Sequence, residues 1–201
     1  MDWKPSPAEG VHRKPLSREY SERGHATSIV RYSAGSSFPQ HDHPLGEEIL
    51  VLSGTFSDDT GDYPAGTYLR NPPGFSHAPF SKDGCTLFVK LHQFAANDTR
   101  RVVIDTQREP WLDGQGNLQV MPLHQHEGES VALVKWPAGE RFQPHRHFGG
   151  EEILVLNGTF RDEHGDYPTG TWMRSPHLSA HFPFVDEETI IWVKVGHLPI
   201  D

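Results

Sequence analysis

One pattern of glycine, histidine, glutamate and proline residues occurs twice in this chain of 201 residues. The first copy contains Gly35, His41, His43, Glu47, Gly54, Gly66, Pro72, Gly74 and His77, and the second contains Gly139, His145, His147, Glu151, Gly158, Gly170, Pro176 and His181. Every residue of the second copy follows its counterpart by 104 positions, as His145 follows His41. A repeat this long exceeds the unit of a solenoid and predicts two domains that arose by duplication.

The histidines and glutamates of each copy have the spacing of metal ligands. Side chains alternate along a strand, so the two imidazoles of His-x-His lie on one face, roughly 6.5 Å apart along the chain. The short segment after each pair can return the glutamate to the same ion, and the last histidine must come from a neighbouring strand. We predict two divalent metal ions per chain. The predicted ligands are His41, His43, Glu47 and His77 at the first site, and His145, His147, Glu151 and His181 at the second.

The similarity between the two halves extends beyond these ligands. The segment from Glu47 to Arg70 aligns with the segment from Glu151 to Arg174, and residues 28–41 align with 132–145. We predict one domain over residues 1–98 and another over 99–201, joined near the polar stretch 95–101. Residues 102–106 could pair with either domain.

The local pattern is all-β. Short runs of β-branched and aromatic residues alternate with turns, and 19 glycines and 17 prolines interrupt the chain. Such strands favour closed or double-sheet barrels, because these leave few exposed edges. Residues 49–52 are apolar on both faces, so the face opposite Glu47 also has to be covered. Packing between the domains or formation of a homodimer would cover it.

The repeated pattern resembles the two motifs of the cupin family, and the first copy agrees at every position. The resemblance identifies the chain as a bicupin with two jelly-roll barrels. More narrowly, residues 41–77 resemble cupin domains of the ChrR type, named after an anti-sigma factor. This resemblance implies a site of three histidines and one glutamate for a divalent ion. The second copy departs from the motif at His177 and at Leu178, which replaces the motif glycine. With a single cysteine, the chain lacks the paired cysteines of the zinc-binding domain of that anti-sigma factor.

The composition of the chain limits the binding partners and the cellular location that we expect for it. The formal charge is −9 and no basic run occurs, which argues against nucleic-acid binding. No apolar run reaches 18 residues, which predicts no membrane span. The lone Cys85 excludes a disulfide within the chain and favours the cytoplasm. We read Cys85 as a small strand residue, with a redox-sensing thiol as the alternative. The remaining expected partner is a small-molecule ligand or substrate.

Two functions of different kinds fit this ligand set. Three imidazoles and one carboxylate leave open coordination positions on Fe, Zn, Mn or Ni, and the ligand types do not select among these metals. One hypothesis is an enzyme, a metal-dependent dioxygenase or related oxidoreductase acting on a small oxygenated, diketone-like molecule. The alternative is a non-catalytic ChrR-like module that senses a ligand or oxidative stress. The sequence identifies no general base.

Several further residues have structural interpretations. We expect His124 and His126, a third His-x-His, to lie in a solvated loop. His177 is expected at the surface, with contact to a substrate as the alternative. The recurring pairs Arg70 and Arg174, and Lys90 and Lys194, are expected to form structural salt bridges rather than an anion site.

Overall fold

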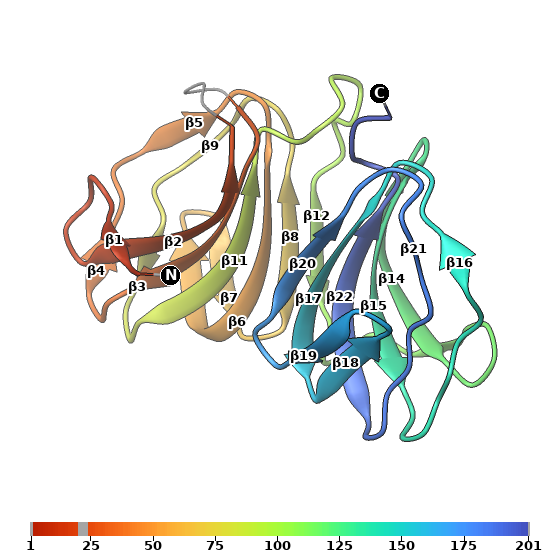
Figure 1. Cartoon of the computed structure of the whole chain (residues 1–201). Coiled ribbons are helices and arrows are strands. Elements are labelled where there is room, and N and C mark those ends of the chain that lie inside the picture. The colour runs from red at the N-terminus through yellow and green to blue at the C-terminus, as the bar shows by residue number, and fades with distance from the viewer. Residues whose placement is uncertain (1, 20–23, 201) are drawn as a thin grey trace. The chain divides into compact units, whose positions relative to one another are not determined.

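The computed structural model describes residues 2–19 and 24–200, and over these residues the chain is all-β (Figure 1). The chain divides into two compact units, Met1–Arg108 and Glu109–Asp201, each with its own curled antiparallel sheets. The predicted fold class is confirmed. Within the described ranges, no helix is long and apolar enough to cross a membrane.

The first unit contains the strands up to β12. They are Lys4–Pro5 (β1), Val11–Arg18 (β2), Ala26–Tyr32 (β3), Ser36–Ser37 (β4), His41–His43 (β5), Glu47–Asp58 (β6), Gly61–Pro64 (β7), Thr67–Asn71 (β8), Phe75–His77 (β9), Phe80–Ser81 (β10), Cys85–Leu91 (β11) and Val102–Asp105 (β12). The main sheet runs β1-β2-β3-β11-β6-β10-β4, with β7 and β8 also paired to β6. A separate two-stranded ladder joins β5 and β9.

The second unit contains the remaining strands. They are Leu112–Asp113 (β13), Gln119–His126 (β14), Glu129–Trp136 (β15), His145–Arg146 (β16), Glu151–Asn157 (β17), Thr159–Asp162 (β18), Gly165–Pro168 (β19), Trp172–Ser175 (β20), Ala180–His181 (β21) and Thr189–Val195 (β22). The main sheet runs β13-β14-β15-β22-β17-β20, and two-stranded ladders join β16 to β21 and β18 to β19.

The two units share strand register as well as sequence. In the first unit Val89 lies opposite Ile49, and in the second Val193 lies opposite Ile153. Each ladder also contains a bulge at the same place, where Leu52 in one unit and Leu156 in the other are passed over. A shared irregularity of this kind supports a duplicated domain.

Strand β12 belongs to the first unit, because it pairs with β8 from Val102 opposite Arg70 to Asp105 opposite Thr67. This pairing resolves the alternative that the sequence left open for residues 102–106. The division between the compact units falls after Arg108, whereas the domain boundary expected from the sequence falls after residue 98.

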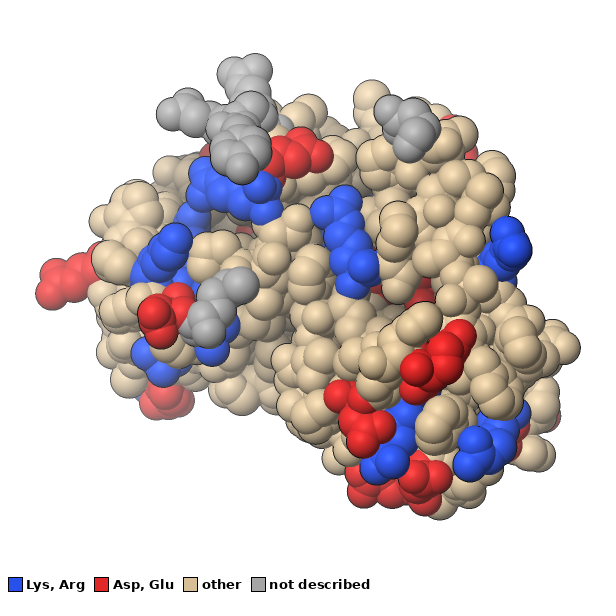
Figure 2. Space-filling model, in the orientation of Figure 1, with Lys and Arg blue, Asp and Glu red and all other residues tan. Residues whose placement is uncertain are grey.

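Each unit encloses an apolar core between its curled sheets. In the first unit the core includes Ile49, Val51, Phe56 and Leu87, and in the second Ile153, Val155, Phe160 and Ile191 occupy the matching positions. On the face of the molecule in Figure 2, basic and acidic side chains are interspersed among uncharged ones.

Candidate metal centres

The first candidate centre is built on the ladder between β5 and β9. The ladder places His41 directly opposite His77, and His43 two residues along the same strand. One ring nitrogen from each of these three histidines lies within 4.8 Å of the other two. The local fold therefore brings together side chains separated by 34 or more positions, as alternation along the strand predicts.

The distances at this centre fit a shared ion. Nε2 of His43 lies 3.0 Å from Nε2 of His77, and Oε2 of Glu47 lies 3.4 and 3.5 Å from these two nitrogens. Donor atoms bound at right angles to one ion at about 2.1 Å lie about 3.0 Å apart. The Glu47 carboxylate does not belong to the group of donor atoms that all lie within 4.8 Å of one another. Asn71 donates a hydrogen bond of 3.2 Å to Oε2 of Glu47.

Hydrogen bonds at the far side of two rings orient them for metal binding. Nδ1 of His41 lies 2.8 Å from the carbonyl oxygen of Pro39, which can only accept, so Nδ1 carries the proton. Nδ1 of His77 lies 3.0 Å from Oδ2 of Asp58. Both bonds leave Nε2 as the lone-pair nitrogen that faces the centre, which is the usual arrangement around histidine ligands.

The second candidate centre repeats this geometry and includes its glutamate. Donor atoms of His145, His147, Glu151 and His181 all lie within 4.8 Å of one another. Oε2 of Glu151 lies 3.4 Å from Nε2 of His147 and 3.7 Å from Nε2 of His181. On the far side of two rings, Nδ1 of His145 donates to the Gln143 carbonyl at 3.0 Å, and Nδ1 of His181 lies 3.3 Å from Asp162.

Two buried atoms at the second centre have no hydrogen-bond partner among the described residues, Nε2 of His147 and Oε2 of Glu151. Burial, together with the neighbouring His181 and His145, lowers the pKa of His147 to about 4. Burial, together with Asp162, raises the pKa of Glu151 to about 8. Buried polar groups are normally satisfied, so these atoms fit a bound cation that would pair with both.

Two carboxylates behind the ligands were not predicted from the sequence. Hydrogen bonds from His77 and Thr60 outweigh the effect of burial on Asp58 and lower its pKa to about 2, so it stays ionised. Burial lowers the pKa of His77, but Asp58 and Glu47 outweigh it and raise the pKa above its usual value. Asp162 is related to Asp58 by the same 104 positions, and that recurrence was the signal for both residues.

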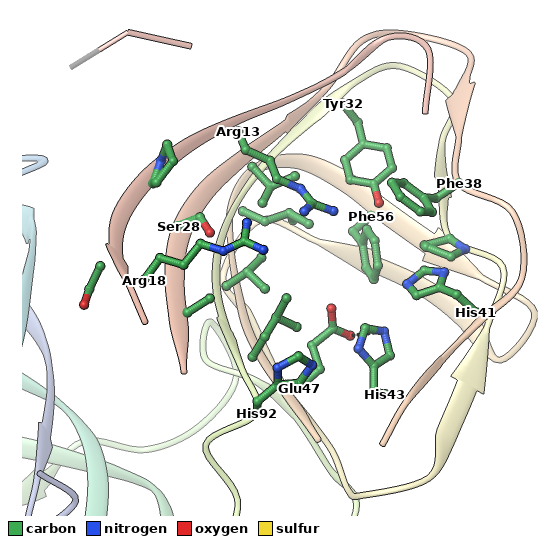
Figure 3. A pocket seen from close by; sticks show the side chains of 18 of the residues that line it. Arg13, Arg18, Ser28, Tyr32, Phe38, His41, His43, Glu47, Phe56 and His92 are labelled. Atoms are coloured by element: carbon green, nitrogen blue, oxygen red, sulfur yellow. Dashed lines mark ion pairs between the residues drawn. The ribbon is translucent and has the colours of Figure 1, made fainter. Parts of the chain in front are cut away.

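A cavity of about 270 Å³ opens beside the first centre, within the first unit (Figure 3). Its wall contains His41, His43 and Glu47, together with apolar side chains and two arginines, Arg13 and Arg18. Figure 3 shows the Glu47 carboxylate pointing into this space beside His43. A metal held by the first ligand set would therefore face a space large enough for a small organic molecule.

The turn before the last histidine differs between the units. Gly74 has a φ of 85° and Leu178 a φ of 62°, in the left-handed region that favours glycine. The backbone hydrogen bonds of the two turns are the same. The amide of Gly74 donates to the carbonyl of His43, and the amide of Leu178 donates to the carbonyl of His147, both at 2.9 Å. Leu178 thus keeps the motif conformation without the motif residue, and its side chain is half exposed.

Leu178→Gly is expected to stabilise the second unit by about 0.5–1 kcal/mol, because relief of left-handed strain exceeds the entropy gained by the unfolded chain. The reciprocal Gly74→Leu, at a position with open space around Cβ, should destabilise the first unit by a similar amount. Urea unfolding of both variants measures the two changes in the free energy of unfolding. A destabilised Leu178→Gly would show that the exposed leucine contributes packing.

The structure also places the three histidines His177, His124 and His126, which the sequence analysis assigned to structural or surface positions. His177 accepts a hydrogen bond from the Gly149 amide at 2.9 Å and packs on Phe148. The expected loop at His124 and His126 is wrong: both lie on β14, and His124 is buried. The pattern missed this strand because two histidines and two glutamines interrupt its apolar residues.

Three of the four recurring basic residues form the expected structural ion pairs. Arg70 contacts Glu48 at 3.1 Å, and Arg174 contacts Glu152 at 3.6 Å. Lys194 contacts Glu129 at 2.9 Å, whereas Lys90 donates to the Thr27 hydroxyl at 3.0 Å.

Cys85 is a buried residue of β11, and burial raises the pKa of its thiol. A reactive thiol needs a lowered pKa, so this placement favours the structural interpretation over redox sensing.

The fold and paired histidine clusters define a protein of the bicupin class. The family model of the ChrR cupin-like domain matches the chain twice, over residues 1–95 and 99–199, and the chain belongs to this family. The resemblance inferred from the motifs is confirmed. Among curated proteins, none shows significant sequence similarity to the chain.

Solved structures show the same fold at low sequence identity. A proposed dioxygenase from Nostoc punctiforme is 16% identical, with a TM-score of 0.80 over 92% of this chain and 73% of that one. A proposed glyoxylate-induced protein from Pseudomonas aeruginosa is 12% identical, with a TM-score of 0.76 over 96% of this chain and 83% of that one. A variant of oxalate decarboxylase from Bacillus subtilis is 12% identical, with a TM-score of 0.66 over 97% and 74%.

Proposed function

We propose that the first barrel is a metal-dependent oxidoreductase of the dioxygenase type, acting on a small oxygenated molecule such as a β-diketone. The observation that carries the proposal is the convergence of His41, His43 and Glu47 at the wall of a cavity, with Nε2 of His77 3.0 Å from Nε2 of His43. When bound there, Fe(II) would supply open coordination positions for a chelating oxygen substrate and for O₂. Dioxygenation incorporates both oxygen atoms into the substrate and needs no separate reductant.

The protein side chains have three roles in this proposal. The imidazoles and Glu47 hold the ion, with Asp58 orienting His77 from behind. Apolar side chains such as Phe56 and Val89 line the cavity and exclude water from the substrate. Relatives with the same fold include a proposed dioxygenase and a decarboxylase, which fits metal-centred chemistry on small oxygenated compounds.

The first barrel is the preferred catalytic centre, because the turn before His77 has open space around Gly74, whereas Leu178 adds a side chain at the matching turn. Apo-protein is reconstituted with Fe(II) or Zn(II), and O₂ uptake is measured with β-diketones and phenolic ketones. We expect uptake only with iron, at least about 100-fold lower in His77→Ala and retained in His181→Ala.

Two outcomes would contradict this assignment. Loss of turnover in His181→Ala with retention in His77→Ala would place catalysis in the second barrel. Absence of O₂ uptake with every substrate, combined with tight binding of a metabolite by the zinc form, would favour the sensing module instead.

A further inference from the structure

We propose that the first cavity binds a small chelating molecule that carries a carboxylate, with Arg13 and Arg18 as the residues that recognise the carboxylate. This inference rests on the proposed function of the same centre and names its substrate class. It assigns one end of the ligand to the metal side of the cavity and the anionic end to the arginine side.

Arg13 is the first observation. It lies on β2 and lines the cavity, and its guanidinium carbon is 5.8 Å from the centre of the Phe38 ring. Within residues 2–19 and 24–200, no carboxylate forms an ion pair with it at 4 Å or less. Burial lowers the pKa of Arg13, a sign that the guanidinium loses solvation which nearby charges do not restore. An arginine in this position is suited to an external anion.

Arg18 and Tyr32 complete the polar side of the cavity. Figure 3 shows the guanidinium groups of Arg13 and Arg18 and the Tyr32 hydroxyl all pointing into the same space. Burial and the charge of Glu47 raise the pKa of Tyr32, so the phenol stays protonated and can donate a hydrogen bond. Two guanidiniums and one hydroxyl offer more donors than a single carboxylate needs.

The charge of the cavity also favours an anion. The acidic residues in its described wall are Glu47, which belongs to the ligand set, and Asp42, which is exposed. A divalent ion with one carboxylate retains positive charge, and the two guanidiniums add to it. A neutral diketone would leave the guanidiniums without an anionic partner, whereas a chelator with a second anionic group would pair with them.

The second barrel lacks these arginines. Arg13 pairs with Val30 across β2 and β3, and the residue in the matching register of the second unit is Val120, opposite Val134. By the same register, Arg18 corresponds to Gln125. Trp136 replaces Tyr32 and packs edge-on against Phe160 with ring centres 5.4 Å apart. The anion site is therefore a property of the first barrel and is not part of the duplicated ligand pattern.

The volume of about 270 Å³ limits the ligand to a small molecule. Two probes isolate the contribution of the carboxylate. Both 2-oxoglutarate and 2-oxopentanoate have five carbons and the same chelating 2-oxo acid group, but only the first has a second carboxylate. Oxaloacetate and 2-oxobutanoate form the matching pair with one carbon fewer, which tests the distance between the metal side and the arginines.

Binding is measured by calorimetry on full-length, Zn(II)-loaded protein, with metal content checked in each variant. We expect Arg13→Gln to weaken the preferred dicarboxylate by about 10- to 100-fold and to change binding of its monocarboxylate partner by less than about threefold. Arg18→Gln should act in the same direction with a smaller effect, because Arg18 is exposed. Arg100→Gln, which removes an exposed arginine outside the cavity wall, should change neither affinity.

Equal weakening of both probes in Arg13→Gln, unchanged dicarboxylate affinity in both cavity variants, or failure of the wild-type protein to bind any probe would overturn the proposal. The outcome is separable from that of the proposed function. If the iron form oxidises a neutral β-diketone and Arg13→Gln leaves the rate unchanged, the function stands and this inference falls. If Arg13 discriminates the probes but no substrate supports O₂ uptake, this inference stands and the function falls.

Discussion

Replacing His77 with alanine is expected to reduce the metal content from about two ions per chain to about one, and His181→Ala should remove the other ion. Each histidine contributes a nitrogen to a single cluster. Nε2 of His77 lies 3.0 Å from Nε2 of His43 in the first cluster, and Nε2 of His181 lies 3.7 Å from Oε2 of Glu151 in the second. Elemental analysis after gel filtration in metal-free buffer, on protein never exposed to chelator or acid, measures the loss.

A milder change gives a graded control. Asp58→Asn keeps every ligand but weakens the charged hydrogen bond that orients His77, so the first site should lose about 10- to 100-fold in metal affinity. The second site, with Asp162 intact, should be unaffected. Loss of both ions from a single substitution would show that the two sites are interdependent, and retention of both in His77→Ala would remove that residue from the ligand set.

The ligand clusters could be predicted from the sequence because they depend on short-range geometry. The spacing His-x-His sets two rings on one face of a strand, and the conserved distance of 104 residues identifies the two partner strands at once. The pairing of His41 opposite His77 and of His145 opposite His181 follows that expectation. The all-β class was predictable for a similar reason, since strand runs and turn residues alternate along the whole chain.

The cavity could not be predicted in the same way. Arg13 and Arg18 lie on β2, where the two units have different side chains, so no repeat marked them. Their inward orientation depends on the register of β2 against β3, which shifts by one residue at a bulge between Pro15 and Ser17. A one-residue shift exchanges the faces of a strand, and the prolines at this bulge and at the matching bulge of β14, Pro15 and Pro122, do not show which residue is passed over. Asp58, at the end of β6, could not be predicted because an aspartate next to a turn is ordinarily explained by the turn itself.

The buried ion cluster around Arg70 carries the largest expected effect on stability. Arg70 is fully buried on β8, donates to Glu48 at 3.1 Å and to Asp98 at 2.6 Å, and stacks on the Phe94 ring at 4.0 Å. The Tyr68 hydroxyl also donates to Glu48, at 2.8 Å. The sequence predicted a salt bridge at Arg70 but not Asp98, which lies in the stretch between the repeats.

Arg70→Met is therefore expected to destabilise the first unit by about 3–5 kcal/mol, because it leaves two buried carboxylates without their cation. The matched control is Arg174→Met in the second unit. There the arginine is about one-third exposed and 3.6 Å from Glu152, so the same change should cost less than about 1 kcal/mol.

Adding Glu48→Gln and Asp98→Asn to Arg70→Met should recover much of the lost stability, since neutral side chains no longer need a cation. Urea unfolding monitored by circular dichroism measures all three variants. A cost below about 1 kcal/mol for Arg70→Met would show that the buried ion pairs contribute little to stability. A large cost without recovery in the triple variant would mean that Arg70 contributes packing on Phe94 rather than charge pairing.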